Sequence, residues 1–234
     1  MAFARMPCGR GRATADRRIV GLDEAGRGST VGPLVVGAFS IAEGSLGELP
    51  RLGVRDSKKL SPARRSEICA ALPSLGACRS IALSPRTIDR YVEREGLNEL
   101  ELATFARLVR GLAPDVAIVD ACDPDAARFG RRLSALVGGG IEVVARHRAD
   151  DEFPVVGAAS IVAKVRRDRA LDGLRRRLGD ALGSGYPSDP RTRAFVEATV
   201  RDGATRPEWL RLSWAPVQRV MRARSARTLD EFVT

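Results

Sequence analysis

One stretch of nine residues near the N-terminus constrains the fold more than any other. In Val20-Gly-Leu-Asp-Glu-Ala-Gly-Arg-Gly28, an apolar run ends in two adjacent carboxylates, Asp23 and Glu24, and a Gly-Arg-Gly triplet follows at once. A strand that ends in acids can hold hard cations in a fixed place, and glycines let a backbone come close to a phosphate or a sugar. The pattern favours chemistry on a phosphodiester. The alternative is a solvated turn, in which adjacent acids are commonly found.

The glycines also resemble loops that cradle nucleotide phosphates. Such loops must run into a helix, whose N-terminus binds the phosphate. Here Pro33 to Ile41 is β-branched and aromatic, which predicts a second strand, and no Gly-Lys-Ser/Thr sequence follows the glycines. The sequence therefore predicts a hairpin of residues 18–25 and 33–41 that begins with two acids.

The composition limits the class of protein. A chain of 234 residues with 44% apolar content can bury one sizeable core and a small appendage. A net charge of +10 favours a polyanionic partner. No apolar run reaches the roughly 18 residues that span a bilayer, and the basic N-terminus has no apolar region typical of a secretory signal. We expect a cytoplasmic monomer with free thiols at its four scattered cysteines, Cys8, Cys69, Cys78 and Cys122.

After the hairpin, predicted strands and helices alternate along the chain. This order indicates a mixed α/β sheet. Helices are expected to begin at Ser61-Pro62 and Ser84-Pro85, where serine caps and proline takes the first turn. Further helices are expected at 97–112, 125–137 and 155–178, strands at 78–83, 115–119 and 141–145, and a last pair of helices after Pro190.

The predicted strands place the acids at their ends. Asp23 and Glu24 end the first strand, Asp120 ends the strand 115–119, and Asp150 lies just past the strand 141–145. If these strands are neighbours, their carboxylates converge and repel one another unless cations lie between them. Two divalent ions about 4 Å apart can activate a water and stabilise the leaving oxygen of a phosphoryl displacement. Magnesium suits such oxygen ligands.

Lysine is rare among the 39 basic residues. Only Lys58, Lys59 and Lys164 are lysine, and the rest are arginine. A compact ammonium is not interchangeable with a planar guanidinium, so contact with phosphates at the active face is one interpretation of these three residues. Chance survival on the surface is the other.

Six motifs, in order, resemble those of ribonuclease HII in its archaeal, single-chain form, over about residues 18 to 200. The motifs are Asp23-Glu-Ala-Gly-Arg-Gly28, Arg55-Asp-Ser-Lys-Lys-Leu60, Val119-Asp120, Ala149-Asp150, Pro154-Val-Val-Gly-Ala-Ala-Ser-Ile-Val-Ala-Lys164 and Gly183-Ser-Gly-Tyr-Pro-Ser-Asp-Pro190. The resemblance implies a ribonuclease-H-like fold, with a five-stranded mixed sheet flanked by helices and a small helical C-terminal appendage. The implied activity is cleavage of RNA in RNA–DNA hybrids and of single ribonucleotides in duplex DNA. It would depend on two Mg²⁺ or Mn²⁺ ions and leave 5′-phosphate and 3′-hydroxyl ends.

The resemblance also assigns roles to single residues. Metal ligands would be Asp23, Glu24, Asp120 and Asp150, with Asp150 favoured over Asp151 because the family's acid follows Lys/Arg-Ala. The triplet would sense the ribose 2′-hydroxyl, a tyrosine would stack on the neighbouring deoxyribose, and the lysines would contact phosphates: Gly26, Arg27, Gly28, Tyr186, Lys58, Lys59 and Lys164. The chain departs from the family pattern at Ser29-Thr30 and at Gly157, where serine is common.

Two other classes of function compete with this interpretation. One is a basic nucleic-acid-binding protein without catalysis, and the other is a ribonuclease-H-like DNA resolvase. A pure binder has no use for acids facing a phosphate backbone, and the Gly-Arg-Gly triplet and Tyr186 indicate reading of ribose. His147, the only histidine, has either a proton-transfer or phosphate role or an ordinary surface role. Trp209 and Trp214 are expected to form a small core for the C-terminal region.

The predicted domains end in a short tail. We expect a basic disordered arm at 1–17, a catalytic domain at 18–200, a helical region at 201–225 and a tail at 226–234. The tail, Ala226-Arg-Thr-Leu-Asp-Glu-Phe-Val233, resembles the peptide by which proteins bind sliding clamps, with Leu229, Phe232 and Val233 as its apolar plug. Ala226 stands where that peptide has glutamine, and Val233 where it has an aromatic. A frayed or packed end is the alternative.

Overall fold

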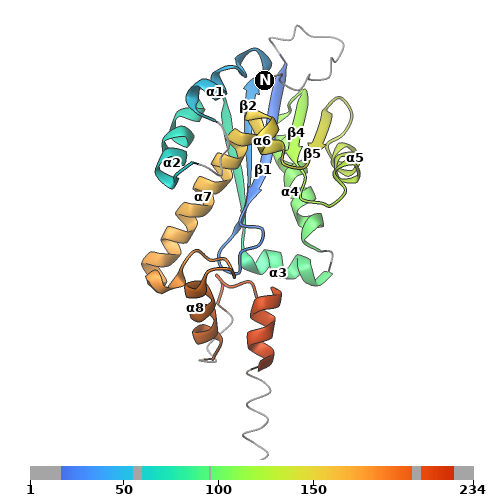
Figure 1. The fold of residues 1–234 in the computed structure, drawn as a ribbon. Helices are drawn as coiled ribbons and strands as arrows, with labels where there is room; N and C mark the ends of the chain where they lie inside the picture. Colours follow the sequence, from blue (N-terminus) through green and yellow to red (C-terminus); the bar gives the residue numbers. More distant parts are fainter. Residues whose placement is uncertain (1–16, 55–59, 95, 202–206, 224–234) are drawn as a thin grey trace, which may run out of the picture. The chain divides into compact units, whose positions relative to one another are not determined.

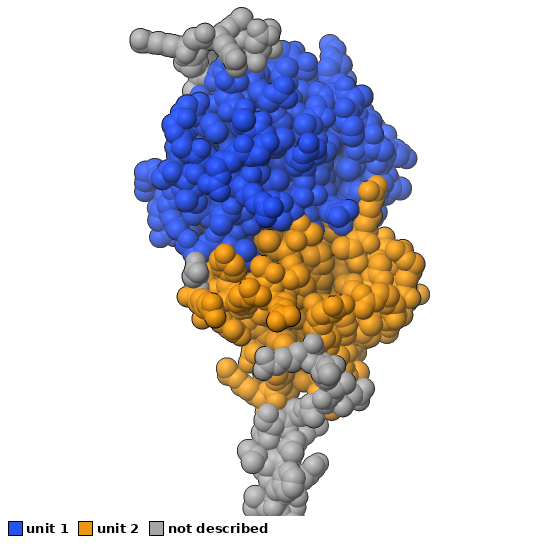
Figure 2. Space-filling view, turned by 180° about the vertical axis from the view of Figure 1, so that it is seen from behind, with its two compact units in different colours: residues 1–25, 35–81, 98–166 blue, residues 26–34, 82–97, 167–234 orange. Residues whose placement is uncertain are grey.

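The computed structural model describes residues 17–54, 60–94, 96–201 and 207–223. They divide into two compact units, coloured separately in Figure 2. Unit 1 comprises Met1–Ala25, Val35–Ile81 and Asn98–Arg166, and unit 2 comprises Gly26–Leu34, Ala82–Leu97 and Arg167–Thr234. No helix in these described residues has the length and apolar character needed to cross a membrane. Within them, Cys69, Cys78 and Cys122 form no disulfide.

Unit 1 is built on a five-stranded sheet with the order β3-β2-β1-β4-β5 (Figure 1). β1 pairs with β2 in antiparallel fashion and with β4 in parallel fashion, and β4 is parallel to β5. The predicted mixed sheet is therefore confirmed. The strands are β1 (Arg18–Ala25), β2 (Leu34–Ala42), β3 (Ala77–Leu83), β4 (Val116–Asp120) and β5 (Glu142–Arg146).

The helices begin where local capping predicts. Ser61 accepts a hydrogen bond from the Arg64 amide at the start of α2, and Asp125 accepts one from the Arg128 amide at the start of α5. The helices are α1 (Glu48–Leu52), α2 (Pro62–Ala71), α3 (Pro85–Arg94), α4 (Leu97–Leu112), α5 (Ala126–Val137), α6 (Ala149–Glu152), α7 (Pro154–Leu178) and α8 (Pro190–Arg201), and residues 215–223 are also helical. The sequence did not predict α1 and α6, which are too short to show a helical period.

The long helix α7 packs tightly on β1 and β2. A Cβ at Gly21 of β1 would lie 2.2 Å from the Val155 carbonyl oxygen, and one at Gly37 of β2 would lie 2.5 Å from that of Ala159. Only glycine permits this approach, because any side chain would overlap the helix backbone. The small residues at the start of α7 allow this close packing. It brings Ser160 of α7 to the sheet next to Asp23, which pairs with Gly37.

Two helices pack near the β4–β5 side of the sheet. Phe105 of α4 meets Phe129 of α5 edge to face, with ring centroids 5.9 Å apart. A Cβ at Gly130 would lie 3.1 Å from the Ala145 side chain, so α5 lies close against β5 (Figure 1). These contacts stabilise the strands from which the acids project.

Unit 2 has an apolar core of its own. Trp209 is buried in it beside Phe195, with ring centroids 5.3 Å apart, and Trp214 packs against the same cluster. The expected role of both tryptophans is confirmed. Val31 forms an isolated bridge with Leu210, which joins the segment after β1 to the C-terminal part of the chain.

Candidate active site

Three carboxylates meet in unit 1. One oxygen from each of Asp23, Asp120 and Asp150 lies within 4.8 Å of the others. Asp23 and Asp150 are buried, and Asp120 is half-buried. The convergence expected from the strand ends is thus present for these three residues.

The backbone explains why they meet. β1 and β4 run parallel with Leu22 beside Val119, so the next residue of each strand is an aspartate. Asp150 reaches the same place through a tight turn in which Arg148 takes the left-handed conformation, with φ 59°. That conformation is uncommon outside glycine. The short helix α6 follows, and the amide of Ala149 donates to Asp120 Oδ1 at 3.4 Å.

The electrostatics of the cluster favour a bound cation. The pKa of Asp23 is raised from 3.8 to about 7, first by burial and further by the nearby charges of Asp120 and Asp150. A hydrogen bond from Ser160 and the positive charge of Lys164 oppose this rise. An oxygen-only set of buried, mutually repelling carboxylates matches the ligands that Mg²⁺ and Mn²⁺ take. The residues present therefore fit a divalent metal.

Lys164 approaches the cluster through Ser160. Its Nζ donates to Ser160 Oγ at 2.7 Å, one turn earlier on α7, and Ser160 is fully buried. The Ser160 hydroxyl in turn hydrogen-bonds Asp23. The sequence prediction named Lys164 but not Ser160, although the spacing of four residues on a predicted helix could have indicated the pair.

The two remaining acids lie differently. Asp151 is exposed and pairs with Arg148, whose Nη2 lies 2.8 Å from Asp151 Oδ2. Glu24 is half-buried, and its backbone amide donates to Asp23 Oδ1 at 2.7 Å. Its carboxylate is not among the three that meet, so the structure groups three of the four predicted ligands.

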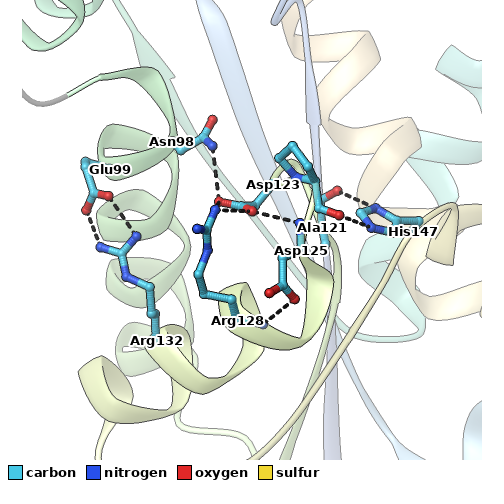
Figure 3. Close-up of polar contacts among 9 residues, drawn as sticks. Asn98, Glu99, Ala121, Asp123, Asp125, Arg128, Arg132 and His147 are labelled. Atoms are coloured by element: carbon cyan, nitrogen blue, oxygen red, sulfur yellow. Dashed lines mark hydrogen bonds and ion pairs between the residues drawn. The ribbon is translucent and has the colours of Figure 1, made fainter.

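A polar network holds the loop that follows Asp120 (Figure 3). Arg128 of α5 donates to both carboxylate oxygens of Asp123, at 2.7 and 2.9 Å, and Asn98 of α4 donates to the same carboxylate. The Asp125 amide also donates to Asp123, and this hydrogen bond is the first cause of the lowered pKa of Asp123. The hydrogen bonds from Arg128 and Asn98 lower that pKa further. The ring nitrogens of His147 lie 3.3 and 3.2 Å from the carbonyl oxygens of Ala121 and Pro124 (Figure 3). His147 therefore contacts the loop after β4 from the turn after β5.

In unit 2, the Gly-Arg-Gly triplet begins a loop packed against the Tyr186 segment. Ser29 Oγ lies 2.6 Å from the Val31 carbonyl oxygen and 2.8 Å from that of Gly185, and its single hydrogen can donate to either; Thr30 Oγ1 donates to Gly185 at 3.0 Å. Ser29 and Thr30 are both buried. The two residues that depart from the family pattern therefore form the junction between the triplet and the residue before Tyr186.

Arg167 of α7 joins the same two segments. Its Nη2 donates to Ser29 Oγ at 2.9 Å, and its guanidinium lies over the Tyr186 ring, 4.5 Å from the centroid. A Cβ at Gly26 would lie 2.4 Å from Arg167 Nε, and Gly26 has φ 87°. Glycine is required there for both reasons. Nothing in the sequence singled out Arg167 from the other 35 arginines.

Some predicted residues cannot be placed. Lys58 and Lys59 lie outside the described residues, and so do the tail residues Leu229, Phe232 and Val233. Arg27 is half-buried and Gly28 is exposed, each within unit 2.

Known proteins share both the sequence and the fold. The family model for ribonuclease HII matches residues 20–217. Ribonuclease HII of Thermococcus kodakarensis is 46% identical over 206 residues, which cover 87% of this chain and 89% of that protein. The crystal structure of ribonuclease H2 from Pyrococcus horikoshii OT3 superposes with a TM-score of 0.83 at 34% identity, covering 89% of this chain and 99% of that one.

A third similar protein was solved with a partner. Ribonuclease HII in the PCNA:RNase HII complex from Archaeoglobus fulgidus has a TM-score of 0.80 and 37% identity, covering 86% of this chain and 96% of that one. The family match spans the acid cluster, the glycine loop and Tyr186. The chain belongs to the ribonuclease HII family and is a metal-dependent endoribonuclease.

Proposed function

We propose that this protein cleaves the RNA strand of RNA–DNA hybrids and the 5′ side of single ribonucleotides embedded in duplex DNA. The products would carry 5′-phosphate and 3′-hydroxyl ends. The observation that supports this most is the cluster of Asp23, Asp120 and Asp150, whose oxygens lie within 4.8 Å of one another. A cluster of like charges at the end of neighbouring strands suits a cation site that acts on a phosphodiester.

Two Mg²⁺ or Mn²⁺ ions would be held by Asp23, Glu24, Asp120 and Asp150. When bound, such ions supply an activated water and stabilise the charge on the leaving oxygen. Asp23 and Asp120 present their carboxylates from rigid strands, and Asp150 presents its own from the turn held by Asp120. Glu24 follows Asp23 directly and would reach the second ion. Lys164, whose Nζ donates to Ser160 Oγ, would bind a substrate phosphate beside the cluster.

Ribose recognition would reside in unit 2. Gly26, Arg27 and Gly28 would sense the 2′-hydroxyl, because the two glycines interpose no side chain. Arg167 lies over one face of Tyr186, and the neighbouring deoxyribose would stack on the other. Lys58 and Lys59 would bind phosphates in a segment outside the described residues. In the sequence, the triplet Gly26 to Gly28 follows the acids Asp23 and Glu24 after one residue.

The test is cleavage of a labelled DNA duplex that carries one ribonucleotide, with Mg²⁺, Mn²⁺ or EDTA. We expect a single cut on the 5′ side of the ribonucleotide with either metal and none with EDTA. An all-DNA duplex of the same sequence is the control for a resolvase or a nonspecific nuclease. Binding of the ribonucleotide duplex without cleavage under all conditions would contradict the proposal and favour a binding protein.

The relative solved with PCNA supports a second proposal, that the C-terminal tail binds a sliding clamp. The residues would be Leu229, Phe232 and Val233 within the tail 226–234, outside the described residues. Each apolar side chain could contribute roughly 1.5–3 kcal/mol on burial. A clamp would raise the local concentration of the enzyme on DNA without changing its active site. The test is titration of the cognate clamp with the intact protein and with a variant truncated after Ser225. Equal binding by both would contradict this role, and cleavage of free duplex should survive the truncation.

We further infer a cytoplasmic monomer, in which residues 18–200 form the catalytic domain. A basic arm at 1–17 and a helical region at 201–225 would flank it. The charge of +10 supports direct association with nucleic acid. Sedimentation of the purified protein with and without duplex would test the monomer.

A further inference from the structure

A buried arginine from the C-terminal segment holds the Gly-Arg-Gly loop. Arg211 has no exposed surface, and its three guanidinium nitrogens each donate to a different carbonyl oxygen. Nη2 donates to Gly26 at 2.7 Å, Nη1 to Arg27 at 2.8 Å and Nε to Gly32 at 3.1 Å. A buried guanidinium without such acceptors would be very costly. The Gly26 carbonyl also accepts from the Ser29 amide at 3.2 Å, and the rigid fork of Arg211 fixes the direction of this carbonyl together with those of Arg27 and Gly32.

The direction of a carbonyl also fixes the direction of an amide. A trans peptide is planar, and its C=O and N–H groups point in opposite directions. The Gly26 carbonyl belongs to the same peptide as the Arg27 N–H, and the Arg27 carbonyl to the same peptide as the Gly28 N–H. Because both carbonyls point at Arg211, both of these N–H groups point away from it. Two successive donors are thus presented on the side of the loop opposite the guanidinium.

That side of the loop is open at Gly28 within unit 2. Gly28 is exposed, and a Cβ built there would meet no atom within 4 Å. The side facing Arg211 is closed, because the guanidinium also lies over the Trp214 ring, 4.9 Å from its centroid. The Arg211 amide donates in addition to the Thr30 carbonyl at 2.9 Å. Arg211 is therefore bound to this loop by both its backbone and its side chain.

We propose that Arg211 is a positioning residue for ribose recognition: it orients the Arg27 and Gly28 amides so that both can donate to the 2′-oxygen of the ribonucleotide. This inference rests on the proposed function. Arg211 itself touches only protein carbonyls and the Trp214 ring in these contacts, so it acts through the backbone. Two aligned amides select an oxygen acceptor at the 2′ position, which a deoxyribose lacks.

A purely structural role is the competing explanation, in which Arg211 only fastens the C-terminal segment to unit 2. That segment has another anchor in Asp89 of α3, which accepts hydrogen bonds from the Leu212 and Ser213 amides, both at 2.9 Å. Loss of a mere fastener would lower stability and reduce activity on every substrate alike. Loss of a positioning residue would change how the loop responds to ribose.

The experiment follows the Gly28 amide by nuclear magnetic resonance in protein labelled with ¹⁵N-glycine. Duplex DNA with one ribonucleotide, or the all-deoxy duplex, is added in EDTA to prevent cleavage. We expect the Gly28 resonance to shift with the ribonucleotide duplex and not with the all-deoxy one. We expect this difference to vanish in Arg211→Lys, which keeps the charge but cannot reach three carbonyls. The matched control is Arg175→Met, which removes an arginine bound to a different carbonyl of unit 2, that of Gly183.

Cleavage rates with Mg²⁺ complete the test. Arg211→Lys should lose about 100-fold in kcat/KM on the single-ribonucleotide duplex, the order expected when a reacting group is misplaced by about 1 Å. Arg175→Met should lose little. Should Arg211→Lys fail to fold, Gly28→Ala provides the second variant, because its methyl enters open space and would obstruct the acceptor. It should fold normally and lose cleavage of the single-ribonucleotide duplex, and the cleavage rate is its readout because it has no Gly28 amide to follow.

Three outcomes would overturn the inference. The Gly28 amide could respond equally to both duplexes in the unaltered protein, or Arg211→Lys could keep both the response and the rate, or Gly28→Ala could keep the rate. Absence of cleavage by the unaltered protein would instead overturn the proposed function, and this inference with it.

Discussion

The acid cluster of unit 1 and the glycine loop of unit 2 differ in the sign of their buried charges and in how those charges are balanced. In the cluster, like charges are brought together, and burial and repulsion raise the pKa of Asp23 to about 7. In the loop, the cations of Arg167 and Arg211 are buried against neutral acceptors, the Ser29 hydroxyl and the carbonyls of Gly26, Arg27 and Gly32. Lys164 offsets the negative charge of the cluster only in part, whereas each guanidinium nitrogen of Arg211 has a carbonyl acceptor in the loop.

The two regions balance charge differently because one would bind a cation and the other a neutral hydroxyl. A site for a divalent cation needs uncompensated negative charge, and its metal-free form bears the cost. A site for a neutral hydroxyl needs aligned dipoles, which buried arginines can hold without presenting charge to the sugar. Substitutions should therefore act through charge in unit 1 and through geometry in unit 2.

The largest expected effect is on the cleavage rate, when one of two adjacent aspartates is neutralised. Asp150 lies in the cluster and Asp151 lies outside it. Asp150→Asn should lower the cleavage rate by orders of magnitude, because it removes charge from the cluster. Asp151→Asn is the matched control and should change the rate little, because Asp151 is exposed and paired with Arg148. Single-turnover cleavage of the ribonucleotide duplex measures both. Equal losses would show that charge near the cluster, rather than in it, controls the rate.

The next largest effect is expected from loss of the Tyr186 ring in unit 2. Tyr186→Ala should lose roughly tenfold or more on a single embedded ribonucleotide, since burying an aromatic side chain contributes about 1.5–3 kcal/mol. The loss on an all-RNA hybrid should be smaller. Tyr186→Phe keeps the flat ring that lies over Arg167 and should retain most activity. Equal losses of Tyr186→Ala on both substrates would indicate general damage instead of lost stacking.

A smaller effect is expected from Ser160, which links Lys164 to the cluster. Its hydrogen bond lowers the pKa of Asp23, so Ser160→Ala should raise that pKa further. The Mg²⁺ concentration for half-maximal rate should then rise by a few-fold, in line with about 0.5–1.5 kcal/mol per hydrogen bond. The rise should be greater at pH 6.5 than at pH 8.5, where Asp23 is ionised in both proteins. Ser74→Ala, which removes an exposed hydroxyl bonded to the Ala71 carbonyl, is the control.

The smallest effect concerns stability. The pKa of Asp23 is higher in the folded protein than the 3.8 of an unperturbed carboxyl, so the folded state binds more protons between about pH 4 and pH 7. The metal-free protein should lose stability as the pH rises through this window. Asp23→Asn should be more stable than the unaltered protein at pH 8 in EDTA, because it removes a buried and repelled charge. The Tm should rise by about 2–4 °C for each kcal/mol of that unfavourable energy. Thermal unfolding followed by circular dichroism measures this, and an Asp23→Asn variant with lower Tm at pH 8 would contradict the electrostatic account.

The sequence predicted the strands and the meeting of Asp23, Asp120 and Asp150, because parallel neighbours bring their carboxyl ends to one edge. It did not predict α6 or the left-handed Arg148, since a four-residue helix has no period and the turn rests on tertiary contacts. Nor could it single out Arg167 and Arg211 among 36 arginines, because the loop residues that each one binds, Ser29 and Gly26, lie more than 130 residues away in the sequence. In the sequence, Gly157 stood out only as a departure from the family pattern, where serine is common. A Cβ there would lie 3.3 Å from the Asp150 carbonyl oxygen, so glycine relieves crowding behind the cluster.

We hold that the buried carboxylates of unit 1 form the cation site, and proton release on metal binding probes this site without relying on activity. Titrating Mg²⁺ calorimetrically at pH 7 in two buffers of different ionisation enthalpy gives the number of protons released. With the pKa of Asp23 at about 7, roughly half a proton should leave the unaltered protein on this account, and almost none at pH 9. Asp23→Asn should release almost none at either pH and bind the metal more weakly. Identical heats in both buffers at pH 7, or unchanged binding and proton release in Asp23→Asn, would contradict the claim.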